Sequence, residues 1–104
     1  MPRIIKQAQA EQDLLDIWLY SFSEWGEKQA DVYIDNLSEA LALLADQPLI
    51  CRKRVEFTPP VRIHHHAHHL IVYLARDDGI NVVRVLHESM DVDGQLEWSE
   101  SGAQ

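Results

Sequence analysis

Residues 13–48 read DLLDIWLYSFSEWGEKQADVYIDNLSEALALLADQP, with apolar side chains recurring at three- and four-residue steps on both sides of a single glycine. Gly26 is the expected end of a first helix that begins near Ala8, and Pro48 prevents a second helix from continuing. The apolar positions are Leu14, Ile17, Trp18, Phe22 and Trp25, then Ala30, Tyr33, Ile34, Leu37, Leu41 and Leu44. So short a link predicts an antiparallel helical hairpin with one shared apolar face, which the rest of the chain must cover.

Four β-rich runs flank this hairpin and supply the cover. Ile4 and Ile5 give β-branched character to residues 3–6, and Asp77-Asp78-Gly79 is typical of a hairpin turn. The later strands are expected over residues 61–66, 70–75 and 80–87, with a corner at Ala67-His68. We therefore predict an α+β fold in the order β-α-α-β-β-β, in which an N-terminal strand precedes a helical hairpin packed on an antiparallel sheet.

The chain has the size and composition of one folded domain. It has 104 residues, of which 46% are hydrophobic and 25% charged, and a chain of this length buries about two-thirds of its surface. Beyond Met90 the composition turns to Asp, Gly, Ser, Glu and Gln. The predicted division is a single domain over residues 1–96 and a disordered tail over residues 97–104.

The expected location is the cytoplasm. The single cysteine, Cys51, cannot form an intrachain disulfide, which favours a reducing compartment. The sequence contains neither an apolar run long enough to cross a membrane nor the apolar centre of a signal peptide.

The net charge of −8 is unevenly distributed along the chain. Residues 1–50 sum to −6, residues 51–87 to +3 and the remainder to −5. Because phosphate neutralisation supplies most non-specific affinity for nucleic acids, so acidic a chain is a poor general nucleic-acid binder. The acidic first half instead suits a partner segment rich in Lys or Arg.

The run His64-His65-His66-Ala67-His68-His69 is the most unusual local feature. His64 and His66 share one face of a strand and are placed to hold a metal ion together, but a structural site needs about four ligands and Cys51 is the only thiol. We therefore predict no metal site and no cofactor. Cys51 lies beside Arg52 and Lys53, but no signature joins it to a catalytic histidine and acid.

A ribonuclease is the sharper enzymatic alternative, because RNA cleavage needs a base, an acid and cations around the phosphate. The candidates for these roles on one sheet face are Tyr73, His69, His87, Arg62, Arg76 and Arg84. The competing interpretation is that Arg62 and Arg84 form salt bridges with the acidic helices.

The aromatic side chains of the hairpin allow two interpretations. Trp18, Phe22, Trp25 and Tyr33 lie on the apolar stripes and are most simply core residues. A sheet covers only one side of a helical hairpin, however, and tryptophan and tyrosine are favoured anchors at protein interfaces. Part of the stripe is therefore also a candidate lining for a groove that receives a partner helix or strand.

Residues 13–48 and 61–91 together resemble the ParE branch of the RelE/ParE toxin superfamily. The specific parts are Trp25-Gly26 with Gln29-Ala30, and Arg84-Val85-Leu86-His87 with Met90-Asp91. The resemblance implies the toxin half of a bacterial toxin–antitoxin pair that acts on DNA gyrase. It further implies neutralisation by a ParD-like antitoxin, whose C-terminal segment wraps the toxin. RelE-type relatives instead cut messenger RNA in the ribosome.

Several positions depart from the family's pattern. Cys51 stands where glycine is common, and His64 and His65 stand where Phe and Pro are frequent. Leu74 and Ser89 replace two arginines that are common in the family. Their loss removes charges with which an RNA-cleaving site would hold phosphate.

We therefore expect a ParE-like toxin that works by binding, with no catalytic residues. Two sets of residues are assigned on this basis. The expected gyrase-binding residues are Arg84, His87, Met90 and Asp91, and the expected antitoxin groove is lined by Trp18, Trp25, Tyr33 and Leu37. Two alternatives stay open: a RelE-type ribosome-dependent mRNA endonuclease, and a non-toxic member that serves only as the antitoxin's partner.

Overall fold

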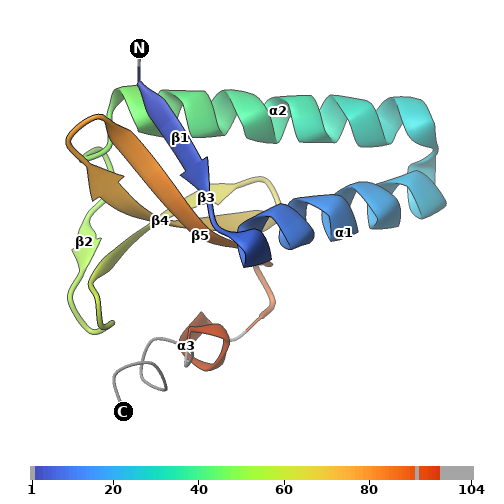
Figure 1. Cartoon of the computed structure of the whole chain (residues 1–104). Coiled ribbons are helices and arrows are strands. Elements are labelled where there is room, and N and C mark those ends of the chain that lie inside the picture. Colours follow the sequence, from blue (N-terminus) through green and yellow to red (C-terminus); the bar gives the residue numbers. More distant parts are fainter. Residues whose placement is uncertain (1, 91, 97–104) are drawn as a thin grey trace.

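The computed structural model describes residues 2–90 and 92–96, so Asp91 and the predicted tail lie outside the described residues. Within these ranges a five-stranded sheet carries two long helices on one face (Figure 1). The chain order is β1 (Arg3–Lys6), α1 (Ala8–Trp25), α2 (Glu27–Asp46), β2 (Lys53–Arg54), β3 (Val61–His66), β4 (His69–Arg76), β5 (Gly79–His87) and α3 (Val92–Gln95). The predicted α+β order is confirmed, with β2 and α3 as additions. No helix in the described ranges is long and apolar enough to span a membrane.

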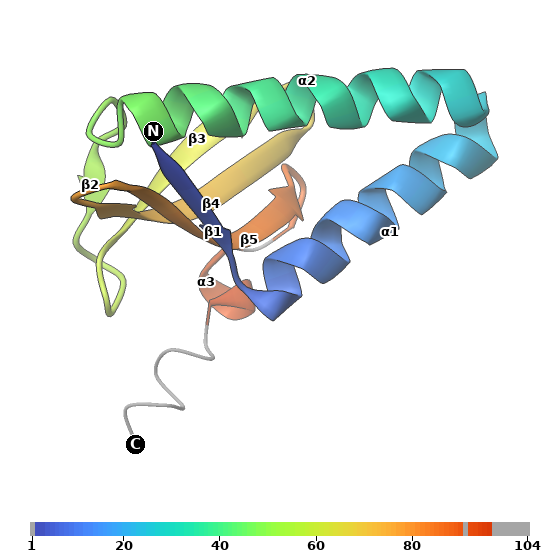
Figure 2. The same ribbon diagram turned by 45° about the horizontal axis from the view of Figure 1, so that its top comes forward.

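Helices α1 and α2 form the predicted hairpin, and Gly26 is the only residue between them. Gly26 has φ +93° and ψ 171°, a conformation open essentially only to glycine. The positive φ agrees with the prediction, although ψ lies outside the left-handed helical region. Figure 2 shows the two helices as a V whose closed end, the hairpin tip, projects away from the strands.

The sheet has the strand order β1-β5-β4-β3-β2. Strands β3, β4 and β5 form the predicted antiparallel meander, and β2 extends it at the edge. Strand β1 pairs in parallel with β5, with Ile4 opposite Ile80. This pairing reaches only as far as Lys6 and Val82, so the second half of β5 has no strand on that side.

The main core lies between the hairpin and the sheet. Leu37, Leu41 and Leu44 of α2 pack with the sheet side chains Ile71 and Tyr73. The hydroxyl of Tyr73 donates a hydrogen bond of 2.9 Å to the carbonyl of Pro48, which ties the end of the hairpin to the sheet. The aliphatic part of the predicted stripes is therefore core, as the helical spacing indicated.

A second, smaller cluster covers the opposite face of the sheet. Val61, Val72, Val83 and Leu86 pack there against Leu96, which follows α3. An irregularity between β4 and β5 pairs Val72 with Arg84 but Tyr73 with Val82, leaving Val83 as an extra residue. Because of this bulge Val82 and Val85, three positions apart, both reach the hairpin-side core.

Candidate binding groove at the hairpin tip

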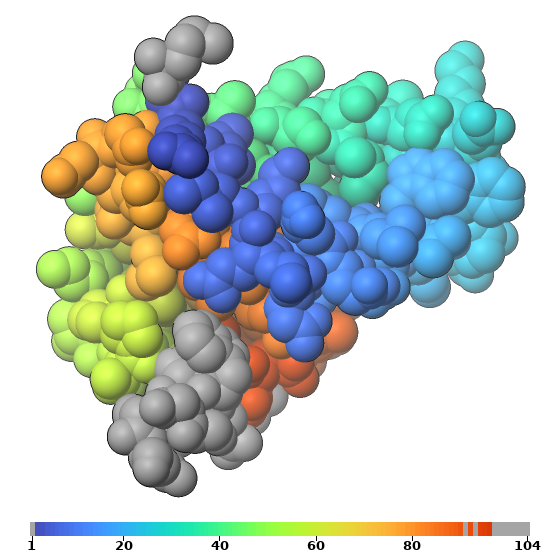
Figure 3. Space-filling model, in the orientation of Figure 1, coloured from blue at the N-terminus to red at the C-terminus, as the bar shows by residue number. Residues whose placement is uncertain are grey.

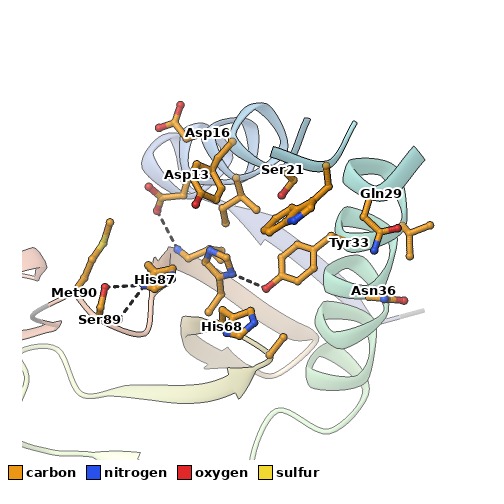
Figure 4. Close-up of a pocket in the computed structure, with 17 residues that line it drawn as sticks. Asp13, Asp16, Ser21, Gln29, Tyr33, Asn36, His68, His87, Ser89 and Met90 are labelled. Carbon is orange, nitrogen blue, oxygen red and sulfur yellow. Dashed lines mark hydrogen bonds between the residues drawn. The ribbon is translucent and has the colours of Figure 1, made fainter. Parts of the chain in front are cut away.

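The hairpin tip overhangs one end of the sheet (Figure 2). A groove of about 880 Å³ lies beneath the tip. We call it the tip groove (Figure 4). Helices α1 and α2 form two of its walls, and the β3–β4 turn with the end of β5 forms the third. Its lining comprises Asp13, Asp16, Ile17, Tyr20, Ser21, Trp25, Gln29, Val32, Tyr33, Asn36, Ala67, His68, His69, Val85, His87, Ser89 and Met90.

Asp13 fixes one side of the tip groove by joining α1 to β5. Its two carboxylate oxygens accept hydrogen bonds from the Arg84 guanidinium at 2.7 and 3.0 Å, and one of them also accepts the backbone N–H of Val85 at 3.0 Å. Both side chains are largely buried, with 15% of Arg84 and 12% of Asp13 exposed. Hydrogen bonding to the Asp13 carboxylate raises the pKa of Arg84.

This arrangement follows from the short β1 strand. Beyond Val82 the edge of β5 has no neighbouring strand, and a buried backbone N–H without a partner is costly. Asp13 lies on the part of α1 that passes this edge and supplies the missing acceptor for Val85. The predicted salt bridge of Arg84 to the acidic helices is thus confirmed. The same prediction for Arg62 is wrong, because its guanidinium donates instead to the backbone carbonyl of Cys51.

A tyrosine and two histidines form the inner wall of the groove. The hydroxyl of Tyr33 lies 2.6 Å from Nδ1 of His69, and the rings of His69 and His87 meet edge to face with centroids 5.4 Å apart. Burial, followed by the neighbouring His87, lowers the pKa of His69 to about 4. Burial also raises the pKa of Tyr33. Near neutral pH the His69 imidazole and the Tyr33 phenol are therefore uncharged, and a hydrogen bond joins them.

The remaining histidines make separate contacts. Nε2 of His65 and Nδ1 of His68 lie 3.0 and 3.1 Å from the two oxygens of Glu88, and these hydrogen bonds lower the pKa of that carboxyl. Nδ1 of His64 lies 3.8 Å from Sγ of Cys51. In the described part of the chain, no three His, Cys, Asp or Glu side chains gather in a way that could hold a metal ion.

An aromatic pair marks the rim of the groove at the tip. The rings of Tyr20 and Trp25 stand edge to face with centroids 6.0 Å apart, and 62% and 63% of these side chains are exposed. On another side of the hairpin, Trp18 stacks on Phe22 and donates a hydrogen bond of 2.9 Å to Asp31. The aromatic residues of α1 are therefore mostly surface residues, and the interpretation of the whole stripe as core is wrong.

The residues assigned to the antitoxin groove separate in the structure. Trp25 and Tyr33 line the tip groove. Trp18 lies outside it, half-buried against α2 through Asp31. Leu37 is 1% exposed and belongs to the core between hairpin and sheet, because its position on α2 turns it toward the strands.

The residues assigned to the gyrase surface also separate. His87 and Met90 are exposed and line the tip groove together with Trp25 and Tyr33. Arg84 is held by Asp13 and presents little of its charge to solvent. Asp91 lies outside the described residues. Members of both predicted sets therefore meet in one groove.

The candidate ribonuclease residues are not brought together on one face. His69 and His87 are neighbours, but Tyr73 is fully buried and bonded to Pro48. Arg76 pairs with Asp78 at the other end of the β4–β5 ladder. Arg62 and Arg84 are engaged by Cys51 and Asp13, as described above.

Two groove residues were missed by sequence reasoning. The hydrogen bond between Asp13 and Arg84 spans 71 positions in the chain, and no local pattern reveals so distant a contact. Tyr20 does not belong to the apolar stripe. The available signal was its spacing of four residues from Asp16, which puts both side chains on the same side of α1.

A helical hairpin packed on one face of a five-stranded sheet, with a candidate binding groove beneath the hairpin tip, defines a small α+β domain. The chain belongs to the family described as the ParE toxin of the type II toxin–antitoxin system, parDE, whose sequence model matches residues 4–92. It is thus a ParE toxin of a type II toxin–antitoxin system, and the resemblance seen in the sequence is confirmed.

Individual relatives agree with this assignment. Toxin ParE1 of Mycobacterium tuberculosis H37Rv is 36% identical over 95 residues, which cover 90% of this chain and 97% of that protein. Toxin ParE of Escherichia coli is 36% identical over 93 residues, covering 88% and 90%. Toxin ParE1 of Caulobacter vibrioides is 30% identical over 94 residues, covering 90% and 95%.

A solved structure supports the fold. A chain of the chromosomal ParDE toxin–antitoxin system from P. aeruginosa superimposes with a TM-score of 0.69. The superposition covers 84% of this chain and 96% of that chain at 17% identity, so the likeness establishes the fold alone.

Proposed function

We propose that this ParE toxin arrests bacterial growth by binding DNA gyrase, with no chemical step of its own, and that a ParD-like antitoxin neutralises it by occupying the tip groove. The observation that carries the proposal is the tip groove itself. It is lined by the half-buried or exposed apolar side chains Trp25, Tyr33, Val32 and Met90, which fit a helix or strand of a partner protein. The cytoplasm is the proposed place of action, because the chromosome and its topoisomerases lie there.

The antitoxin part of the proposal is supported by the relatives. The solved neighbour is titled as a ParDE system, and the family model names the parDE pair. We extend that partnership to this chain and expect a complex of toxin with antitoxin.

The preference for binding over RNA cleavage is supported by the positions of the charged side chains. Arg62, Arg76 and Arg84 are each engaged within the fold by a different partner. The groove that contains His69 and His87 also contains the carboxylate of Asp16, which has no cation partner among the described residues and repels a phosphate. These features disfavour a site that stabilises a phosphorane.

The shared groove also suggests how neutralisation works. His87 and Met90, assigned to gyrase binding, line the same groove as Trp25 and Tyr33, assigned to antitoxin binding. An antitoxin segment seated there covers both sets. We therefore propose that the antitoxin excludes gyrase by direct competition.

Inducible expression in a bacterial host tests the proposal. We expect the wild-type chain to arrest growth and to induce the DNA-damage response, and we expect the double variant His87→Ala with Met90→Ala to lose this effect. Arg84 is unsuitable for the test because its loss leaves Asp13 unpaired. The matched control is Leu49→Ala with Val55→Ala, two side chains that are 70% and 73% exposed elsewhere on the surface.

Growth at the rate of an empty-vector culture would contradict the proposal and indicate a member that serves only as the antitoxin's partner. Growth arrest with cleaved transcripts and no DNA-damage response would contradict it in favour of an mRNA endonuclease.

A further inference from the structure

The hairpin carries the entire net charge of the protein. Helices α1 and α2 contain nine acidic residues and one basic residue, a net charge of −8, while the rest of the chain sums to zero. Among the described residues, Asp13 is the only acid of the hairpin that forms an ion pair. The exposed apolar side chains around the hairpin tip therefore belong to a strongly acidic pair of helices, whose tip projects at one end of the molecule in the space-filling view (Figure 3).

Asp13 and Asp16 line the same groove but differ in what holds them. The carboxylate oxygens of Asp13 accept hydrogen bonds from the guanidinium of Arg84 and from the N–H of Val85. Asp16, nearly one turn further along α1, is exposed and accepts a single neutral hydrogen bond of 2.9 Å from the side chain of Gln12. No cation of the described chain therefore pairs with the Asp16 carboxylate.

Tyr20 lies one helical turn beyond Asp16 on the same side of α1. Side chains four residues apart on a helix are neighbours, with Cβ atoms about 5–6 Å apart. Trp25 holds Tyr20 edge to face, and 62% of Tyr20 stays exposed. A carboxylate beside an open aromatic ring matches the guanidinium of arginine, which donates hydrogen bonds to the carboxylate while its plane stacks on the ring.

From this geometry we infer that the antitoxin segment seated in the tip groove is basic and amphipathic, and that one of its arginines binds Asp16 and the ring of Tyr20. The inference rests on the proposed antitoxin function and adds the chemistry of the partner. Charge decides between the occupants, because a second copy of this chain would place one hairpin of net charge −8 against another.

The test measures the binding of fluorescein-labelled peptides to the full chain by fluorescence anisotropy. The peptides are amphipathic helices of about 20 residues with one common apolar face and a polar face built from Arg, Lys or Glu. We expect the Arg peptide to bind most tightly, the Lys peptide more weakly and the Glu peptide not at all.

Matched variants distinguish an arginine bound specifically at Asp16 from general attraction of a basic peptide to the acidic hairpin. We expect Asp16→Asn to weaken binding of the Arg peptide about tenfold, as loss of one charge-assisted contact does. Asp35→Asn removes the same charge from an exposed site on α2 outside the groove. We expect this variant to change the affinity for the Arg peptide by less than about twofold, because salt screens a distant charge. Tyr20→Leu is expected to abolish the preference for Arg over Lys.

Equal weakening by Asp16→Asn and Asp35→Asn would overturn the inference, as would binding of the Glu peptide as tightly as the Arg peptide. Sedimentation of the free protein as a dimer that Asp16→Asn tightens would assign the groove to a second copy. Growth arrest by the wild-type chain is scored separately, so failure of the proposed toxin function is distinguishable from failure of this inference.

Discussion

Asp13 has the largest structural role of any acidic residue in the hairpin. Its carboxylate accepts hydrogen bonds from the guanidinium of Arg84 and from the N–H of Val85, at the edge of β5 that has no neighbouring strand. We expect Asp13→Ala to lower the free energy of unfolding by about 2–4 kcal/mol, because it leaves a largely buried cation and a backbone donor without partners. Urea denaturation measures this loss. Asp16→Ala is the control, and a loss for Asp13→Ala as small as that of the control would contradict the assigned role.

His69 makes stability depend on pH. Its folded pKa of about 4 lies below the ordinary histidine value of 6.5, because the ring is partly buried beside Tyr33, His66, His68 and His87, with Glu88 opposing the shift. As the pH falls below 6.5, the unfolded chain takes up a proton that the folded chain does not. The stability that the neutral His69 contributes is therefore fully present above about pH 6.5. It is lost progressively as the pH falls from 6.5 to about 4.

We expect the free energy of unfolding to fall between pH 7 and pH 5, with a His69 share on the order of 1 kcal/mol, since solvent screening reduces the effect of a partly exposed ring. Urea denaturation of the wild-type chain and of His69→Gln at both pH values isolates this share. The same fall in both proteins would exclude His69 as its source, and an imidazole NMR titration midpoint near 6.5 would contradict the low pKa.

At the scale of elements, β1 depends on a glycine. Gly79 has φ +151°, and a Cβ placed there would lie 1.9 Å from the carbonyl oxygen of Arg3. We expect Gly79→Ala to cost more than about 3 kcal/mol, because β1 must move away from β5. The control is Gly26→Ala, where a Cβ meets no atom within 4 Å and only backbone strain of about 1–3 kcal/mol is added.

Thermal and urea unfolding compare the two glycine variants. Amide exchange of Arg3 and Gln7, whose N–H groups donate to the carbonyls of Asp78 and Val82, reports on the pairing of β1. Equal losses in both variants, with β1 still protected, would show that β1 tolerates the displacement.

The elements differ in how far their sequence predicts them. The aliphatic spacing of Leu37, Leu41 and Leu44 predicts both the helix α2 and its buried face, because period and burial agree. The aromatic residues of α1 follow the same period but line the surface, and periodicity alone does not separate a core face from an exposed rim. The two-residue strand β2 and the short helix α3 carry too few residues to show any period.

The candidate site was predicted only in part, because its contacts are long-range. The sequence predicts Trp25, Tyr33, His87 and Met90 as binding residues through their type and family motif. It did not show that all four line one groove. That result depends on the overhang of the hairpin tip and on the register that places His69 opposite His87.

At the scale of the whole molecule, charge and shape are divided between two layers. The hairpin holds the net negative charge and the exposed aromatic residues. The sheet holds basic residues, of which Arg54, Arg76 and Arg84 pair with carboxylates within the fold. Such a molecule is suited to holding another protein at the junction of the layers, where the tip groove lies.

A gyrase supercoiling assay with the purified protein, run beside an in-vitro translation reaction, tests this account most directly. The account predicts that the wild-type chain blocks supercoiling while transcripts in the translation reaction stay intact, and that His87→Ala with Met90→Ala restores supercoiling. Normal supercoiling accompanied by cleaved transcripts would contradict it.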